Sequence, residues 1–256
     1  MAKQIVGESK TLLVAGNWKM NGSTATASDF LESIVHHWNG SDRVDVGLFP
    51  PSVYVSQFEK TLRGSSIKVG GQNIATKLEG AFTGEVSSRM LKDLGCQMVL
   101  VGHSERRINF QEDDETIAAK YHLACAADLT PILCVGETSD HRDAGSTIDV
   151  ISEQIDAVKS LVGEHDLCAG VIAYEPVWAI GSGVAASPTQ AQEVHSSIRD
   201  LLGPNGKQTQ IIYGGSLNRD NAQALFAEQD IDGGLVGGAS LHAEHFLEII
   251  RLAEYA

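Results

Sequence analysis

Short apolar runs alternate with longer amphipathic runs along the whole chain, and no other feature limits its fold as strongly. The apolar runs have the length of strands, and we expect strands at residues 12–15, 44–49, 67–69, 98–101, 132–135, 171–174, 210–213 and 235–236. The intervening runs carry apolar residues at helical spacing, and we expect helices at residues 28–37, 115–126, 147–162, 189–201 and 244–253. Such alternation is typical of an α/β fold with a parallel sheet.

Two of the expected strands are continuously apolar, Val-Ile-Ala-Tyr at residues 171–174 and Met-Val-Leu-Val at residues 98–101, whereas the eighth is only weakly strand-like. Such runs indicate strands that are buried on both faces, as in parallel sheets covered by helices. Eight strands without a polar linker or a break in composition favour a closed barrel over an open doubly wound sheet. We therefore expect residues 1–256 to form a single-domain (β/α)₈ TIM barrel, with residues 1–10 as an N-terminal extension.

The charge and the cysteines exclude several classes of function. The formal net charge is −14, which repels nucleic acids and anionic membrane surfaces, so neither is an expected partner. The four cysteines show no C-x-x-C spacing, and the start of the chain has no apolar signal-peptide core. No run approaches the roughly 18 apolar residues of a membrane span. We expect reduced thiols and a cytoplasmic protein.

Polar residues and glycines follow the expected strands. They are Asn17, Lys19, Gln72, Asn73, His103, Glu137 and Glu175, and the glycine turns at residues 214–216 and 237–238. In a (β/α)₈ barrel these positions gather at one mouth, where barrel active sites lie. Lone buried charges are costly, so packing alone does not explain a lysine, a histidine and a carboxylate around one axis. The pattern predicts an active site at this mouth.

The two glycine turns are suited to bind phosphate. Each precedes an expected helix, the first of them at residues 218–226. Glycine lets backbone N–H groups approach a ligand closely, and a helix N-terminus adds partial positive charge. A pair of such turns after strands seven and eight is the usual phosphate position of a barrel. The turns would give an acidic chain a local site for an anion.

A further glycine motif, at residues 181–186, matches the dinucleotide fingerprint G-x-G-x-x-G/A. Its glycines do not open a helix directly after the strand, because residues 176–180 intervene. We therefore interpret residues 176–186 as a mobile lid over the active site, and not as a nicotinamide site. No H-E-x-x-H arrangement occurs, so we expect no metal and no cofactor.

Glu175 and His103 are the candidates for acid–base chemistry. Glu175 follows the buried run at residues 171–174, and a carboxylate shut away from water becomes a stronger base. A structural ion pair is the alternative function of this carboxylate. His103 ends a strand and precedes an expected helix start at residues 104–107, which favours a catalytic role over a structural one.

Six segments resemble the motifs of the triosephosphate isomerase family, in the family's order. They are Gly16-Asn-Trp-Lys-Met-Asn-Gly22, Gly80-Ala-Phe-Thr-Gly-Glu85, Val101-Gly-His-Ser-Glu-Arg-Arg107, Ala173-Tyr-Glu-Pro-Val-Trp-Ala-Ile-Gly181, Tyr213-Gly-Gly-Ser216 and Gly237-Gly-Ala-Ser-Leu241. The resemblance implies a cofactor-free aldose–ketose isomerase of glycolysis and gluconeogenesis. Such an enzyme interconverts dihydroxyacetone phosphate and D-glyceraldehyde 3-phosphate.

The resemblance also implies a role for each candidate residue. Glu175 would be the base that moves a proton between neighbouring carbons through an enediol(ate), and neutral His103 would polarise the carbonyl as an electrophile. Triosephosphate isomerases are themselves a standard case of a histidine kept neutral by a helix N-terminus. Lys19 would supply positive charge and Asn17 a hydrogen bond, with Glu105 as the carboxylate beside the lysine.

In the family the phosphate is held near the lid, which here implies Gly181, Ser216, Gly237 and Gly238. The lid departs from the family's usual Gly-Thr-Gly-Lys-(Ser/Thr)-Ala, because residues 181–186 read Gly-Ser-Gly-Val-Ala-Ala. This change removes a lysine and a hydroxyl group from the hinge. We expect it to alter the opening kinetics and to leave the chemistry untouched.

The segment at residues 72–86 resembles the family loop that reaches into a second subunit, and it implies a homodimer. Thr83 would approach residues 17–19 of the partner subunit, and Glu85 would pair with Arg106 of the partner subunit. Two other functions stay open. One is another phosphosugar isomerase or epimerase on the same barrel, and the other is a barrel that only binds phosphorylated ligands.

Overall fold

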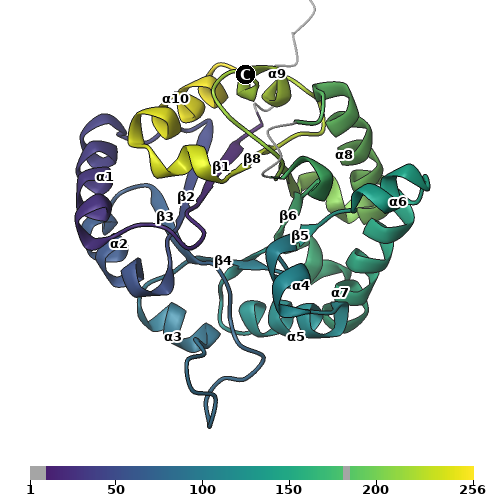
Figure 1. Ribbon diagram of the computed structural model, residues 1–256, viewed down its shortest axis with the longest axis horizontal. Helices are drawn as coiled ribbons and strands as arrows, with labels where there is room; N and C mark the ends of the chain where they lie inside the picture. Colours follow the sequence, from purple (N-terminus) through teal and green to yellow (C-terminus); the bar gives the residue numbers. More distant parts are fainter. Residues whose placement is uncertain (1–9, 181–184) are drawn as a thin grey trace, which may run out of the picture.

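The computed structural model describes residues 10–180 and 185–256, which form a closed barrel of eight parallel strands (Figure 1). The strands are β1 (Leu12–Asn17), β2 (Val44–Phe49), β3 (Ile67–Gly71), β4 (Met98–Val101), β5 (Thr130–Val135), β6 (Val171–Tyr174), β7 (Gln210–Tyr213) and β8 (Gly233–Val236). Each strand pairs with the next in sequence, and β1 pairs with β8 to close the barrel. The expected (β/α)₈ barrel is confirmed. Four strands have the expected bounds, and each of the others is two residues longer than expected.

Helices surround the barrel on its outside (Figure 1). In the described ranges they are α1 (Thr24–His37), α2 (Val55–Leu62), α3 (Ser88–Asp93), α4 (Ser104–Phe110), α5 (Asp114–Cys125), α6 (Ser139–Asp143), α7 (Thr147–Ala169), α8 (Pro188–Leu202), α9 (Ala222–Phe226) and α10 (Ala243–Glu254). Short 3₁₀ helices are η1 (Ser52–Tyr54), η2 (Val177–Ala179), η3 (Pro204–Gln208) and η4 (Gly238–Leu241). The five expected helices correspond to α1, α5, α7, α8 and α10. In α7, Gly163 has a non-helical φ of 81°, directly after residue 162, where the prediction ended the helix.

The helix expected at residues 218–226 is wrong in its start, because α9 begins only at Ala222. Asparagine side chains occupy the preceding turn. Asn221 Oδ1 accepts a hydrogen bond from the Asn218 backbone N–H at 2.9 Å, and Asn221 Nδ2 donates to the Ser216 carbonyl at 2.9 Å. Asparagine competes in this way with the helical backbone. Ser216 therefore lies on a turn and not at a helix N-terminus.

The apolar core has two layers, separated by the wall of the barrel. In β1, Leu13 and Ala15 belong to the cluster inside the barrel, whereas Leu12 and Val14 belong to the cluster between the strands and the helices. Opposite β1, Gly233 has a φ of 134°, and a Cβ at that position would meet the Leu13 carbonyl oxygen at 1.9 Å. Only glycine lets β8 approach β1 closely enough to close the barrel.

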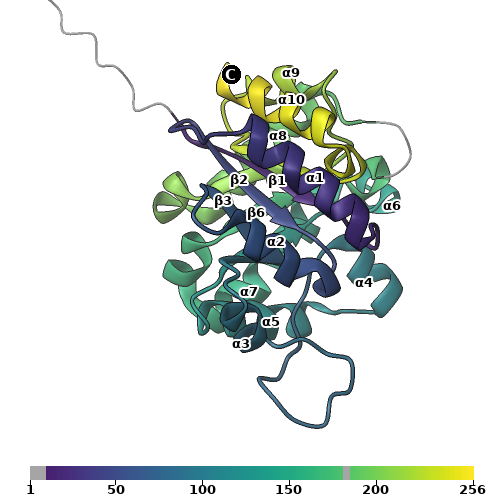
Figure 2. The same ribbon diagram turned by 90° about the vertical axis from the view of Figure 1, so that its left-hand side faces the viewer.

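One segment departs from the compact outline of the barrel. The connection between β3 and α3, which includes residues 72–86, projects away from the strands in both views (Figures 1 and 2). It is the segment that the sequence singled out as a loop toward a second subunit. No helix within residues 10–180 or 185–256 is both long and apolar enough to cross a membrane.

Candidate active site

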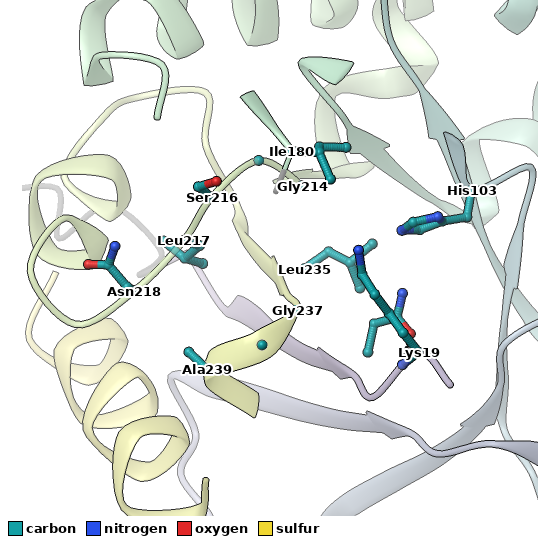
Figure 3. Close-up of a pocket in the computed structure, with 13 residues that line it drawn as sticks. Lys19, His103, Ile180, Gly214, Ser216, Leu217, Asn218, Leu235, Gly237 and Ala239 are labelled. Atoms are coloured by element: carbon teal, nitrogen blue, oxygen red, sulfur yellow. Dashed lines mark hydrogen bonds between the residues drawn. The ribbon is translucent and has the colours of Figure 1, made fainter. Parts of the chain in front are cut away.

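A cavity of about 260 Å³ opens at the carboxyl ends of the strands (Figure 3). Its lining residues are Asn17, Lys19, His103, Ile180, Gly214, Gly215, Ser216, Leu217, Asn218, Leu235, Gly237, Gly238 and Ala239. They follow or end strands β1, β4, β6, β7 and β8, so the barrel brings together segments that are far apart in the sequence. In Figure 3, Lys19 and His103 lie toward one end of the cavity, and Ser216 and Asn218 lie toward the other.

Lys19 is held in a strained backbone conformation next to this cavity. Its φ is 51°, a left-handed value that costs a non-glycine residue about 1–3 kcal/mol. Two hydrogen bonds hold it there: its N–H donates to Asn17 Oδ1 at 3.0 Å, and its carbonyl oxygen accepts from Gln72 Nε2 at 2.9 Å. Its Nζ lies 2.5 Å from Glu105 Oε1, so the carboxylate that the family resemblance placed beside the lysine is in contact with it.

His103 is the N-cap of α4, and its ring is fixed by the backbone of that helix. The Glu105 N–H donates to His103 Nδ1 at 3.2 Å, which requires a lone pair on Nδ1. The ring proton of the neutral imidazole is therefore on Nε2, and Nε2 lies 3.0 Å from Glu175 Oε1. This places a buried imidazole N–H directly beside a buried carboxylate.

Glu175 follows β6 and is 1% exposed, behind the residues that line the cavity. Its Oε2 accepts a hydrogen bond from the Ser104 N–H at 2.8 Å. Burial raises the pKa of Glu175, but the His103 ring and the Ser104 N–H outweigh burial and lower it below its usual value. In this arrangement, burial therefore does not by itself make the carboxylate a stronger base.

The pKa of His103 is subject to opposing causes. Burial, the largest single cause, lowers it, but the Glu175 and Glu105 carboxylates together outweigh burial and raise it. The Glu105 N–H favours the neutral ring, because only that form has a lone pair on Nδ1. The charge state of His103 therefore depends on how close Glu175 stays to Nε2.

The two glycine turns form the other side of the cavity. A Cβ on Gly238 would enter open space, and one on Gly237 would reach only Lys19 Cε, at 3.6 Å. Gly238 also begins η4, whose first N–H groups have no acceptor within the helix. The Ser216 hydroxyl donates to the Ala179 carbonyl at 2.6 Å, so that side chain is bonded to the β6–α8 connection. Residues 181–184, which include Gly181 and the middle of the expected lid, lie outside the described residues.

Glu137 is a second strand-end carboxylate that does not line the cavity. It is buried, and its Oε1 accepts hydrogen bonds from Tyr174 Oη at 3.1 Å, Trp178 Nε1 at 2.8 Å and Arg142 Nη1 at 3.2 Å. It therefore fixes the start of the β6–α8 connection. In the part of the chain that the structure describes, no group of three or more His, Cys, Asp or Glu side chains is arranged to hold a metal ion.

Sequence reasoning missed several lining residues, among them Ile180, Asn218 and Leu235. Leu235 lies in an expected strand, and the inward and outward alternation along β8 would have directed it into the barrel. Asn218 was assigned to a helix that does not begin there. Ile180 lies in the expected lid and in the family motif at residues 173–181, but no role was assigned to its side chain.

Comparison with known proteins decides between the barrel families that this geometry allows. The family profile described as Triosephosphate isomerase matches residues 12–253. The chain belongs to the triosephosphate isomerase family. The triosephosphate isomerases of Photorhabdus laumondii subsp. laumondii and Salmonella typhimurium are each 47% identical to it over 248 residues, which cover 95% of this chain and 97% of each relative. That of Legionella pneumophila is 48% identical over 243 residues, covering 93% of this chain and 97% of the relative.

Membership in the triosephosphate isomerase family makes this chain an aldose–ketose isomerase by descent, with a fold that the family shares. The match extends across all eight strands, from β1 to α10. Lys19, His103 and Glu175 all lie within it, at the same mouth of the barrel. The residue roles are argued below from their contacts.

Proposed function

We propose that this protein interconverts dihydroxyacetone phosphate and D-glyceraldehyde 3-phosphate through an enediol(ate), without a cofactor. The observation that carries the proposal is the 3.0 Å approach of His103 Nε2 to Glu175 Oε1, beside a cavity that also contains Lys19 and two glycine turns. An N–H donor next to a carboxylate is what proton transfer between adjacent carbons needs. The cavity is small, as suits a three-carbon substrate.

In this mechanism Glu175 removes a proton from the carbon next to the carbonyl, while His103 donates its Nε2 hydrogen bond to the carbonyl oxygen. The C–H electrons form the enediolate double bond, and the carbonyl oxygen takes up the negative charge. His103 then transfers protons between the former carbonyl oxygen and the hydroxyl oxygen on the adjacent carbon. Glu175 returns its proton to the carbon that carried the carbonyl group. Atoms and charge balance within one substrate, which is why no cofactor is needed.

Substrate binding would change the surroundings of Glu175. The carboxylate now faces Ser104 N–H and His103, which lower its pKa. A substrate carbonyl on His103 Nε2 would replace the carboxylate there and separate the pair. Burial would then dominate and raise the pKa of Glu175, which increases its strength as a base when the substrate is present. The same separation would keep His103 neutral.

Lys19 would hold the phosphate and the developing negative charge, because its Nζ is the cation of the cavity lining. Glu105 orients it through the 2.5 Å contact, and Asn17 sustains the backbone that presents it. The N–H groups at Gly237 and Gly238 would bind phosphate oxygens, together with Ser216 and Gly181. Residues 176–186 would cover the site during the reaction and exclude water, which protects the enediolate from losing phosphate.

A homodimer and a cytoplasmic location are part of the same proposal. The projecting segment at residues 72–86 carries Phe82, which is 47% exposed, and Met20 beside the active site is 95% exposed. Thr83 and Glu85 lie on this segment, as the family loop requires. Arg106, the proposed partner of Glu85, pairs with Glu112 in its own chain at 2.7 Å. Glu85 of a second subunit would therefore add a second carboxylate to this ion pair. We also propose that residues 1–256 form one domain.

Conversion of glyceraldehyde 3-phosphate by the purified protein, followed by NMR without added nucleotide or metal, tests this function. Appearance of dihydroxyacetone phosphate at catalyst concentrations far below the substrate supports it. Turnover of ribulose 5-phosphate alone would identify another phosphosugar isomerase or epimerase. Binding of both sugars with turnover of neither would identify a phosphate-ligand binder.

A further inference from the structure

His195, on α8, is a buried histidine that the proposed mechanism does not use. It has 0% exposure, and its Nδ1 lies 3.2 Å from the Asp230 carbonyl oxygen. A carbonyl oxygen only accepts, so the ring proton is on Nδ1. Burial lowers the pKa of His195 to about 3, and the ring is therefore uncharged at neutral pH.

The ring lies beside two tyrosines that are neighbours in the barrel. Tyr174 ends β6 and Tyr213 ends β7, and they are register partners. The centroid of the His195 ring is 5.7 Å from that of Tyr174, at an interplanar angle of 85°, and 6.5 Å from that of Tyr213, at 34°. One imidazole therefore packs beside both rings within the layer between strands and helices.

The hydroxyl groups of these tyrosines connect to the two described flanks of the β6–α8 connection, residues 175–180 and 185–187, one through Glu137 and the other directly. Tyr174 Oη donates to Glu137 Oε1, the atom that also accepts from Trp178 Nε1 on the first flank. Tyr213 Oη accepts from the Ala186 N–H, at 3.2 Å, on the second flank. The first flank ends in Ile180, which lines the active-site cavity. The two tyrosines therefore join the barrel to a part of the active site.

The other side of His195 is anchored to a network of charged and polar groups. The carbonyl oxygen of Asp230 accepts the hydrogen bond from Nδ1. Its two carboxylate oxygens accept hydrogen bonds from Arg199 Nε at 2.9 Å and from Gln192 Nε2 at 2.6 Å. Arg199 Nη2 is paired in turn with Asp232 Oδ2, at 2.5 Å. The hydrogen bond to Asp230 thus holds the imidazole in place. The held ring then limits how far the two tyrosine rings that pack beside it can move.

We infer that His195 is a positioning residue for the isomerase site, because its ring places Tyr174 and Tyr213 and their hydroxyls place both flanks of the β6–α8 connection. The inference rests on the proposed function. Protein interiors are densely packed, so a smaller side chain at His195 leaves a void against both tyrosines. Each ring can then shift toward the void, and its hydroxyl moves away from Glu137 or Ala186.

The test compares His195→Asn, which keeps an N–H donor and removes the ring, with His195→Phe, which keeps a ring and removes the donor. His165→Asn is the matched control, because the His165 side chain on α7 is 95% exposed. We expect His195→Asn to lower kcat/KM about three- to tenfold, mainly through KM, since contacting residues couple by such factors. His195→Phe should retain most of the wild-type kcat/KM, and His165→Asn all of it.

A double-mutant cycle with Tyr213→Phe separates positioning from general destabilisation. If His195 acts through the Tyr213 hydroxyl, His195→Asn has a markedly smaller effect in the Tyr213→Phe background than in the wild type. Equal factors in both backgrounds, or wild-type kcat and KM in folded His195→Asn, would overturn the inference. His195→Gln takes the place of His195→Asn if that variant does not fold.

Hydrogen exchange at the Ala186 amide gives a readout that does not depend on catalysis. This N–H is bonded to Tyr213 Oη, and we expect it to exchange faster in His195→Asn than in His165→Asn. Unchanged exchange would contradict the inference. An inactive wild-type protein would refute the proposed function instead, and the exchange comparison would still decide whether His195 positions the tyrosine.

Discussion

His103 Nε2 lies 3.0 Å from Glu175 Oε1, although the two residues follow different strands of the barrel, β4 and β6. Neither side chain could be held there by its own segment. The Glu105 N–H holds the imidazole from behind, and the Ser104 N–H holds the carboxylate, so the first turn of α4 orients both groups. The proposed acid–base pair is therefore held by one helix N-terminus.

The phosphate site can be weakened without disturbing the fold. A Cβ at Gly238 would point into open space at the cavity, so Gly238→Ala should fold normally. The methyl group would occupy room that a phosphate oxygen needs near the backbone N–H groups. We expect an approximately tenfold rise in KM, the loss of about one hydrogen bond to a charged group, with an unchanged melting temperature. A KM equal to that of the wild type would remove Gly238 from the phosphate site.

His195 should make stability depend on pH in a defined window. Its pKa is about 3 in the folded protein, against about 6.5 in the unfolded chain, so the folded state favours the neutral ring. The contribution of His195 to the free energy of unfolding is complete above pH 6.5. It falls by about 1.4 kcal/mol per pH unit as the pH drops toward 3. The positive charges of Lys10 and Arg199 lower the pKa of His195 further.

Urea unfolding at several pH values checks this window. The difference in the free energy of unfolding between wild type and His195→Asn should shrink between pH 6.5 and 4, because the variant has no imidazole to protonate. His165→Asn, at an exposed position, should track the wild type throughout. Parallel curves for wild type and His195→Asn would show that the buried ring does not titrate as described.

Chelators should leave the reaction rate unchanged. In the proposed mechanism, Lys19 and the N–H groups of the glycine turns would supply the positive charge that a metal would otherwise provide to the phosphate and the enediolate. Initial rates after dialysis against EDTA, compared with rates after addition of magnesium or zinc, measure this. Activity that disappears on chelation and returns with one metal would require a metal site in the reaction.

The projecting segment should be required for self-association. Phe82 is 47% exposed there, and Phe82→Asp would place a charge in the proposed subunit interface, where its desolvation is costly. Sedimentation at micromolar concentration should give a dimer for the wild type and a monomer for the variant. Leu161→Asp is the control, since Leu161 is 54% exposed on α7 and should leave the dimer intact. A monomeric wild type would refute the interface.

The barrel was predictable from the sequence because short, mostly apolar runs alternate with amphipathic helical runs, and polar residues or glycines follow most of the strands. The convergence of Lys19 and His103 at one cavity follows from that topology alone. The orientation of Glu175 does not, because it depends on an N–H group of α4 that no local pattern connects to β6. For the same reason the direction of its pKa shift could not be read from burial.

Other parts of the site also lay beyond sequence reasoning. The start of α9 depends on how Asn221 bonds to the turn at Asn218 and Ser216, which is a choice between competing hydrogen bonds. The packing of His195 beside two tyrosines joins α8 to β6 and β7, and only the folded structure brings them together. The sequence therefore predicted most helices and strands, but not the contacts between them.

The most direct test of the account is the turnover of glyceraldehyde 3-phosphate by Glu175→Ala, with Glu153→Ala on the exposed face of α7 as the control. If Glu175 is the base, its removal lowers kcat by about 10²–10⁴-fold, while inorganic phosphate still inhibits, because the base and the phosphate site are separate. The control should match the wild type. Near-wild-type turnover by Glu175→Ala would contradict the central claim that this carboxylate carries the proton.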